Sequence, residues 1–235
     1  YFLPSAISLT VTDGRVYRRW GLDETAEYPA AVAAFDLDSG RMRWTTAGSE
    51  GWAGLAPISE PAVGEERVYT LAAPPARSAT RRGRSLAQGS VFLVCNDADT
   101  GRMLWKRRIG RTHTNAYLVE LPYDLPSKMD VVHYGGAVTV HRGSVYVSSG
   151  AGFIARCDAR DGMVDWARSY HLFPNVGQDL LATRRAIPPV PVGETVLFAP
   201  RDSAGLFAVS ADEGEVAWDN PAAGVDAVVS VSPGS

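Results

Sequence analysis

The stretch FDLDSGRMRW, residues 35–44, returns almost unchanged as NDADTGRMLW, residues 96–105. Both copies lead from an apolar run through a short polar turn that contains glycine, and both end on a tryptophan. Alignment on that residue gives four copies, which end at Trp44, Trp105, Trp166 and Trp218. Because self-similarity at a regular spacing is the signature of repeat architectures, one structural unit is used four times along this chain.

Each copy is preceded by three runs that read as strands. The run that enters the turn, as in AVAAFD and SVFLVCND, is rich in Val, Phe and Leu and fits a half-buried strand. Before it lie RVYRRW, RVYTLA, SVYVSS and TVLFAP, and before those the small-residue segments SAISLTV, SEPAV, YGGAVTV and IPPVPV. With the tryptophan-bearing run added, each repeat predicts a four-stranded antiparallel sheet.

The turn within each repeat has a physical explanation. An Asp side chain can accept hydrogen bonds from nearby backbone N–H groups, and a glycine supplies the positive φ that closes a short bulged hairpin. The tryptophan then falls on the outermost strand, where its ring can pack against a neighbouring sheet. We therefore interpret these residues as structural anchors rather than catalytic groups: Gly40, Gly101, Gly162, Gly214 and the four tryptophans.

Four-stranded sheets repeated with a tryptophan signature describe the blades of an all-β protein, the β-propeller. We expect one partial propeller domain over residues 1–235, with blades at about 5–50, 56–110, 133–170 and 185–221. Residues 222–235, with DAVVSVSPGS at 226–235, read as the innermost strand and start of a further blade. Because an open arc leaves sheet faces uncovered, we expect a propeller of seven or eight blades; closure within four is the alternative.

The string GSVYVSSGAGFIARCDARDGMVDW, residues 143–166, resembles the propeller repeat of pyrroloquinoline quinone (PQQ)-dependent dehydrogenases and their non-enzymatic relatives. That repeat runs roughly as Gly-x-Val-Tyr-Val, an Asp-Gly turn, Leu-Tyr-Ala-Leu-Asp-Ala and then x-Thr-Gly-x-x-x-Trp. The resemblance covers all four repeats, hence most of the chain. It implies a quinoprotein alcohol dehydrogenase-like propeller and leaves the activity open, because the motif is structural.

Composition excludes several classes of protein. The 235 residues are 46% hydrophobic and carry a net charge of −3, so the chain can bury a core and shows no footprint for nucleic acid. No apolar run approaches the roughly 18 residues of a membrane-spanning helix. The sequence opens with Tyr1, and no targeting signal is visible in it. Cys95 and Cys157 lie in strand-like runs without metal-site spacing, which predicts buried free thiols.

The long connections are all expected at one end of the blades. Turns between the first and second and between the third and fourth strands are short, whereas the long segments are 21–30, 45–60, 74–89, 111–132 and 171–186. Long loops on a rigid scaffold are where binding usually occurs. The candidate binding residues of this face are His113, His133, His171, Trp52, Arg81, Arg82, Arg184 and Arg185. The alternative is that these side chains are simply solvated; His141 belongs to the opposite end.

The resemblance implies a search for PQQ and calcium at the propeller axis, held with adjacent cysteines, a Glu/Asn/Asp set and a catalytic Asp. This chain has no Cys-Cys pair, and no calcium set falls on matching positions, so no functional residue of the family is carried over. Asp36-x-Asp38 and Asp97-x-Asp99 lack the bidentate Glu of a calcium loop at the twelfth position. We expect no catalytic residue, no metal and no cofactor.

The function expected from these features is that of a non-catalytic scaffold, which binds a protein partner or a small ligand through its loop-rich face. The alternative is a segment of a PQQ-dependent dehydrogenase whose cofactor residues lie outside this chain; a third is a module that supports folding of a neighbouring domain. Further blades of a parent protein would be additional partners. The resemblance also implies a bacterial, extracytoplasmic place, whether periplasmic, secreted or membrane-anchored.

Overall fold

The computed structural model describes residues 9–20, 31–74, 88–113, 136–170, 186–200, 202–203 and 205–221. Their strands form successive antiparallel sheets, in which neighbours along the chain pair with each other. The first sheet consists of β1 (Thr10–Thr12), β2 (Arg15–Trp20), β3 (Ala31–Asp36) and β4 (Met42–Thr45). The second consists of β5 (Ala56–Pro57), β6 (Ala62–Gly64), β7 (Arg67–Ala73), β8 (Gln88–Asp97) and β9 (Met103–His113).

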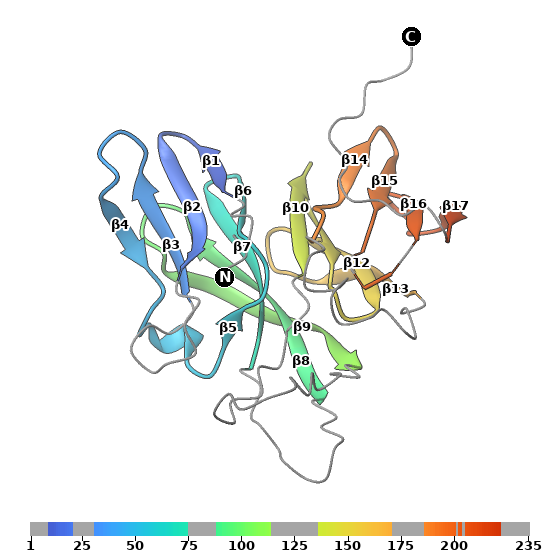
Figure 1. Cartoon of the computed structure of the whole chain (residues 1–235), viewed down its shortest axis with the longest axis horizontal. Coiled ribbons are helices and arrows are strands. Elements are labelled where there is room, and N and C mark those ends of the chain that lie inside the picture. The colour runs from blue at the N-terminus through green and yellow to red at the C-terminus, as the bar shows by residue number, and fades with distance from the viewer. Residues whose placement is uncertain are drawn as a thin grey trace, which may run out of the picture.

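The third sheet consists of β10 (Ala137–His141), β11 (Ser144–Ser148), β12 (Phe153–Asp158) and β13 (Val164–Ser169). The fourth consists of β14 (Val190–Val192), β15 (Thr195–Phe198), β16 (Leu206–Ser210) and β17 (Val216–Asn220). We refer to these sheets as the first to fourth blades. They follow one another from the blue first blade to the red fourth blade (Figure 1). The strands expected from the repeat are therefore present in each blade.

The second blade departs from the predicted four strands, because its innermost strand is split into β5 and β6, which pair with opposite ends of β7. Between them the Ser59 hydroxyl accepts the N–H of Leu71 at 2.9 Å, in place of a backbone carbonyl. Pro61 has no N–H to give to a sheet ladder. The prediction of one uninterrupted strand was wrong here, since a side chain and a proline replace the regular backbone pairing.

Consecutive blades share apolar cores made from facing sheets. The first and second blades pack through Tyr17, Val32, Val68 and Val94, among others. Tyr69, Leu93, Val145 and Cys157 belong to the core of the second and third blades. Tyr146, Trp166, Val196 and Phe198 belong to that of the third and fourth. Each blade thus buries residues on the face turned toward its neighbour, as blades of a propeller do.

A short 3-10 helix, η1 (Glu50–Trp52), lies in the connection from the first to the second blade. The sequence predicts only a loop in this connection. The Trp52 side chain is buried in the core between the two blades, and Leu55 and Met103 pack against the same core. The connection is therefore fixed in place by an aromatic residue that packs inward.

Candidate binding face and blade junctions

The two ends of the blades differ in how their connections are built. At one end, which we term the turn face, each blade has two tight turns, as at residues 13–14 and 37–41 of the first blade. In each blade a backbone N–H of the outer turn donates to a backbone carbonyl of the inner turn. The four pairs are Leu37 to Gly14, Ala98 to Glu66, Ala159 to Gly143 and Ala211 to Glu194. The two tight turns of every blade are thus joined by a backbone hydrogen bond.

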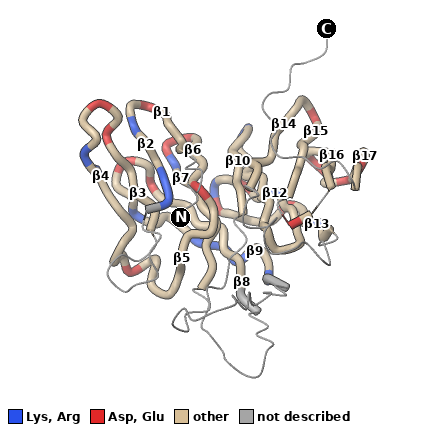
Figure 2. Tube along the Cα trace, viewed as in Figure 1, with Lys and Arg blue, Asp and Glu red and all other residues tan. Residues whose placement is uncertain are grey.

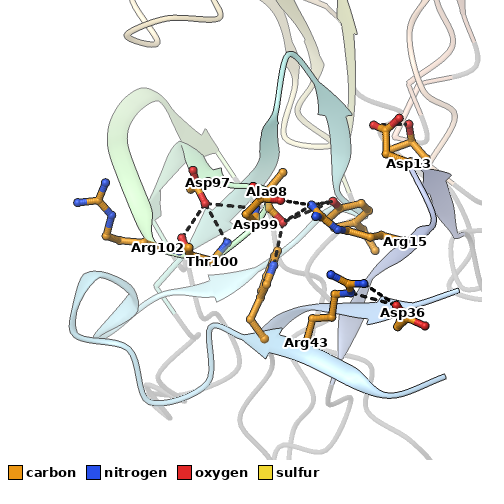
Figure 3. Close-up of polar contacts among 12 residues, drawn as sticks. Asp13, Arg15, Asp36, Arg43, Asp97, Ala98, Asp99, Thr100 and Arg102 are labelled. Atoms are coloured by element: carbon orange, nitrogen blue, oxygen red, sulfur yellow. Dashed lines mark hydrogen bonds and ion pairs between the residues drawn. The ribbon is translucent and has the colours of Figure 1, made fainter. Parts of the chain in front are cut away.

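Carboxylates cap the outer turns. Asp97 Oδ1 accepts the N–H of Thr100 at 2.8 Å and its hydroxyl at 2.7 Å (Figure 3). Asp36 Oδ1 accepts the N–H and the hydroxyl of Ser39 in the same way. These hydrogen bonds lower the pKa of Asp97, and those from Arg43 and Ser39 lower the pKa of Asp36. In the fourth blade Ser210 stands in the Asp position, and its hydroxyl accepts the N–H of Glu213 at 3.3 Å.

Each of the first three tryptophans reaches across to the turn of the next blade. A Cβ added to Gly101 would lie 2.5 Å from the ring of Trp44. A Cβ added to Gly162 would lie equally close to the ring of Trp105, and one added to Gly214 equally close to that of Trp166. The indole N–H of Trp44 donates to the Ala98 carbonyl at 2.9 Å, and that of Trp166 to the Ala211 carbonyl at 3.0 Å. A glycine is needed at this turn for two reasons, its positive φ and the ring that lies against it.

The second junction uses a different donor. The Tyr69 hydroxyl donates to the Ala159 carbonyl at 2.9 Å, and the Arg67 guanidinium donates to the same oxygen at 3.1 Å. The buried indole N–H of Trp105 has no hydrogen-bond partner. The indole and the tyrosine are therefore alternative donors to one carbonyl, and the stacking of the ring on glycine is the constant part of the junction.

Arginine side chains also form hydrogen bonds and ion pairs with the neighbouring blade, and no such contact was predicted from the sequence. Arg15 of β2 forms an ion pair with Asp99 and donates to the Ala98 carbonyl, as Figure 3 shows. In the third blade Ser144 occupies the equivalent position. Arg156 of the next strand bonds Ser144 Oγ at 2.9 Å and reaches Asp212 at 2.7 Å instead. The Arg-Val-Tyr start of two repeats could have indicated the arginine contacts of the first and second blades. Nothing in the repeat pattern indicates that Arg156 makes the contact where Ser144 stands in place of that arginine.

At the opposite end, the loop face, strand ends are joined by the connections at 21–30, 46–55, 74–87, 114–136 and 170–189. The strand order confirms that these longer segments leave the blades on one side. Its shorter connections, 149–152 and 199–205, belong to the third and fourth blades. The scaffold therefore combines a compact turn face with a loop face in which connection length varies.

A tyrosine–carboxylate contact holds two of these connections together. The Tyr170 hydroxyl donates to Asp202 Oδ1 at 2.5 Å, and the Gly152 N–H donates to Asp202 Oδ2 at 3.0 Å. Burial raises the pKa of Tyr170 well above its usual value. The hydrogen bond from the part-buried Tyr170 to the buried Asp202 thus connects the third and fourth blades at the loop face, and the repeat pattern predicts neither residue.

The candidate binding residues fall into three groups. Trp52 packs into the core, so its ring is not offered at the surface. His113 is the last residue of β9, at the loop-face end of the second blade. The others lie outside the described residues: Arg81, Arg82, His133, His171, Arg184 and Arg185. The structure accordingly brings no cluster of these candidates together among the residues that it describes.

The outer edge of the second blade is basic. Lys106, Arg107, Arg108 and Arg111 are all exposed along β9, where Figure 2 shows blue segments. Lys106 donates to the Gly51 carbonyl at 3.3 Å, and Arg107 donates to the Asp161 carbonyl. This edge strand runs from the turn face toward the loop face and ends at the candidate His113.

The described residues contain no cluster of metal-binding side chains. No three His, Cys, Asp or Glu side chains lie close enough together in that part of the chain to hold a metal ion. The innermost strands β1, β6, β10 and β14 contain no Asp or Glu, so their described residues supply no carboxylate to an axial calcium. Within the same ranges, no helix has the length and apolar character needed to cross a membrane.

Antiparallel blades in succession, of which the first three each place an indole on the glycine turn of the next blade, define the fold as a β-propeller. The chain belongs to the PQQ-repeat family described as outer membrane protein assembly factor BamB, whose family model matches residues 4–220. The resemblance inferred from the repeat is thereby confirmed. No curated protein matches the chain in sequence.

Solved structures share the fold at low sequence identity. BamB from Moraxella catarrhalis has a TM-score of 0.53 and 13% identity, with 93% of this chain and 48% of that chain covered. The computationally designed Ika8 protein has a TM-score of 0.53 and 10% identity, with 95% and 52% covered. A europium-containing methanol dehydrogenase has a TM-score of 0.50 and 13% identity, with 91% and 41% covered. The chain therefore spans about half the length of these structures, and the likeness establishes the fold alone.

Proposed function

We propose that this chain is a non-catalytic propeller module that binds a protein partner or ligand through its loop face. The observation that carries the proposal is the asymmetry of the two ends. The turn face bonds its own backbone groups, whereas the loop face contains the connections that vary in length from blade to blade. Binding residues usually lie on loops of this kind, which vary while the scaffold beneath them stays rigid.

A protein partner is favoured over a small substrate by the basic outer edge of the second blade. The exposed Arg108 and Arg111 of this edge suit an extended, acidic surface better than a small molecule. The family's name refers to the assembly of outer membrane proteins, which supports a partner and an extracytoplasmic place by analogy. Further blades in a parent polypeptide would be partners of the same module.

Site-specific photocrosslinking tests the proposal. A benzophenone side chain introduced at position 79, in the connection from β7 to β8, should crosslink one discrete partner in cells that produce the protein. The same side chain at Arg142, in a tight turn of the opposite end, is the matched control and should crosslink none. Equal crosslinking from both positions, or none from any long connection, would contradict binding through the loop face.

A cofactor titration separates the scaffold from the dehydrogenase alternative. PQQ and calcium are added to the full-length protein, and quinone absorbance and the oxidation of alcohols or sugars are followed. The scaffold proposal expects neither stoichiometric quinone binding nor turnover. A saturable quinone signal with calcium-dependent oxidation would overturn it, because a non-catalytic module neither binds the quinone stoichiometrically nor oxidises a substrate.

A further inference from the structure

The outer strand of the second blade is longer than its counterparts. β9 contains 11 residues, whereas β4, β13 and β17 contain 4, 6 and 5 (Figure 1). One edge of β9 pairs with β8 from Met103 to His113, and no described strand pairs with its other edge. The first and third blades flank the second, so this open edge does not arise from a missing neighbouring blade. An open strand edge presents unpaired N–H and C=O groups, to which another extended segment can add.

This edge also has an excess of positive charge. β9 contains four cations, Lys106, Arg107, Arg108 and Arg111, all of them exposed, and no Asp or Glu. Its counterparts have no such excess, because the single Arg of β4 is ion-paired, β13 contains one Asp and one Arg, and β17 contains one Asp. The positive charge is therefore a property of this strand and not of the repeat.

Three of the four cations form a row on one face of the sheet. Lys106 and Arg108 lie opposite residues of β8 that pack toward the first blade. Arg111 lies opposite Ser90 on the same face, because Ile109 is the extra residue of a β-bulge; in a regular strand Arg108 and Arg111 would point to opposite faces. The row repeats at about 7 Å, the distance between alternate residues of a strand.

The outer end of this row is free for a partner. Lys106 donates to the Gly51 carbonyl, which leaves its charge without a carboxylate. The guanidinium groups of Arg108 and Arg111 form no hydrogen bond or ion pair with any other described residue. A free guanidinium can bind a carboxylate through two parallel N–H donors.

We propose that the open edge of β9 binds an extended, acidic segment of a protein partner, which adds to the second blade as a further strand. The backbone of the segment would pair with the free N–H and C=O groups of β9. Carboxylates at every second residue would lie opposite Lys106, Arg108 and Arg111, where opposite charges across a strand pair attract. This binding mode rests on the proposed function, because it takes the partner of the loop face to be a protein; β9 ends at that face, so a partner bound there can also reach the edge.

Two observations favour an acidic polypeptide over another polyanion. The edge offers alternating backbone donors and acceptors, with which an extended peptide can pair and a nucleic acid or a lipid surface cannot. The chain has a net charge of −3, whereas nucleic-acid-binding domains are usually basic as a whole. Charged side chains also protect edge strands against aggregation, so the experiment has to separate that role from binding.

Fluorescence anisotropy with a labelled synthetic peptide tests the proposal. The probe alternates Glu and Thr over the length of β9. Two control peptides have the same net charge: one has the same composition with its Glu residues in a single block, and the other is the alternating probe with every backbone nitrogen methylated. The probe should bind saturably and each control about tenfold or more weakly, because the first lacks the spacing and the second lacks the N–H donors.

A double substitution on the protein tests the same contact from the other side. Arg108→Gln with Arg111→Gln should weaken probe binding about tenfold or more, because two opposite-charge pairs are lost. Arg41→Gln with Arg142→Gln is the matched control, since it removes the same charge from exposed arginines of the turn face whose side chains have no bonding partner among the described residues. The control should bind the probe as the wild type does, and circular dichroism should show both double variants folded.

Several outcomes would overturn the proposal. One is the absence of saturable probe binding; another is equal binding of the methylated peptide, because charge alone would then hold it. Tighter binding of an oligonucleotide of equal charge would identify a general polyanion surface instead. Aggregation of the Arg108 and Arg111 double variant, without probe binding by the wild type, would show that the charges only protect the edge. A chain that crosslinks a partner from position 79 and binds no probe would contradict binding at the β9 edge alone, and would leave the loop face as the binding surface.

Discussion

Trp44 of the first blade donates its indole N–H to the carbonyl of Ala98 in the second, and the same indole ring covers Gly101. The stability of one blade therefore depends on the turn of the next. A substitution on either side of this contact should therefore lower the stability of both blades, not only of the blade that contains it.

Trp166 is the clearest test of this contact. Trp166→Ala should reduce the free energy of unfolding by about 3–5 kcal/mol through lost packing, and Trp166→Phe by about 1–2 kcal/mol through the lost hydrogen bond to Ala211. Trp218→Ala, at the exposed equivalent position, should cost under about 1 kcal/mol. Chemical denaturation measures all three, and equal losses at Trp166 and Trp218 would contradict the assignment.

Gly101 tests the other side of the same junction. Gly101→Ala combines a strained positive φ with a clash against the Trp44 ring, so we expect a loss of at least about 2 kcal/mol. Gly143→Ala has a similar φ with open space and should cost about 1 kcal/mol. Thermal unfolding compares the two variants, and a smaller loss at Gly101 than at Gly143 would show that the ring moves aside freely.

A stabilising change is expected in the second blade. The inner turns contain glycine at Gly14 and Gly143, but the second blade has Glu65 and Glu66 there, both with positive φ. Because such a backbone is strained for a residue with a side chain, Glu66→Gly should stabilise the chain by about 1 kcal/mol. Denaturant midpoints will show the shift, and a destabilised variant would mean that the Glu66 side chain makes a contribution of its own.

The two thiols should be inert while the chain is folded. Burial raises the pKa of Cys95 and of Cys157 to about 12, so almost no thiolate exists at pH 8. Labelling with a thiol-reactive dye should therefore wait for unfolding and then modify both residues, as expected for the buried free thiols predicted from sequence and found in the structure. Rapid labelling of the native chain would show that the blades open locally.

The carboxylates of the turns give stability a definite dependence on pH. The pKa values of Asp97 and Asp158 are lowered in the folded chain by hydrogen bonds, from Thr100 and from Arg160 respectively. The unfolded chain therefore binds protons at higher pH than the folded chain, so stability is lost as pH falls below the ordinary value of 3.8. Unfolding curves from pH 6 to 2 should show this loss, and Asp97→Asn with Asp158→Asn should flatten it.

The repeat made much of the fold predictable, because an Asp-capped turn, a positive-φ glycine and an alternating run each specify local geometry. The strands around Trp44 and Trp166 lie where those patterns place them. The split between β5 and β6 was not predictable, because it depends on a Ser59 hydroxyl that replaces a backbone partner across the sheet. A local sequence pattern does not show where a side chain takes the place of a backbone partner across the sheet.

The candidate site was less predictable than the fold, for the same reason. Trp52 follows a loop-like segment, and only its packing between two blades shows it to be a core residue. Tyr170 and Asp202 lie in different repeats and outside the repeated motif, so no periodicity connected them. The repeat contains information about what all blades share, whereas a binding face is built from what each blade has alone.

The placement of each tryptophan on the following turn has a consequence for how such arrays evolve. A duplicated repeat brings with it both a ring to dock and a glycine to receive one, so an extra unit inserted by unequal recombination joins its neighbours without compensating mutations. Whole blades can therefore be gained or lost in one genetic event, whereas a single substitution of the tryptophan or of the glycine destabilises the protein.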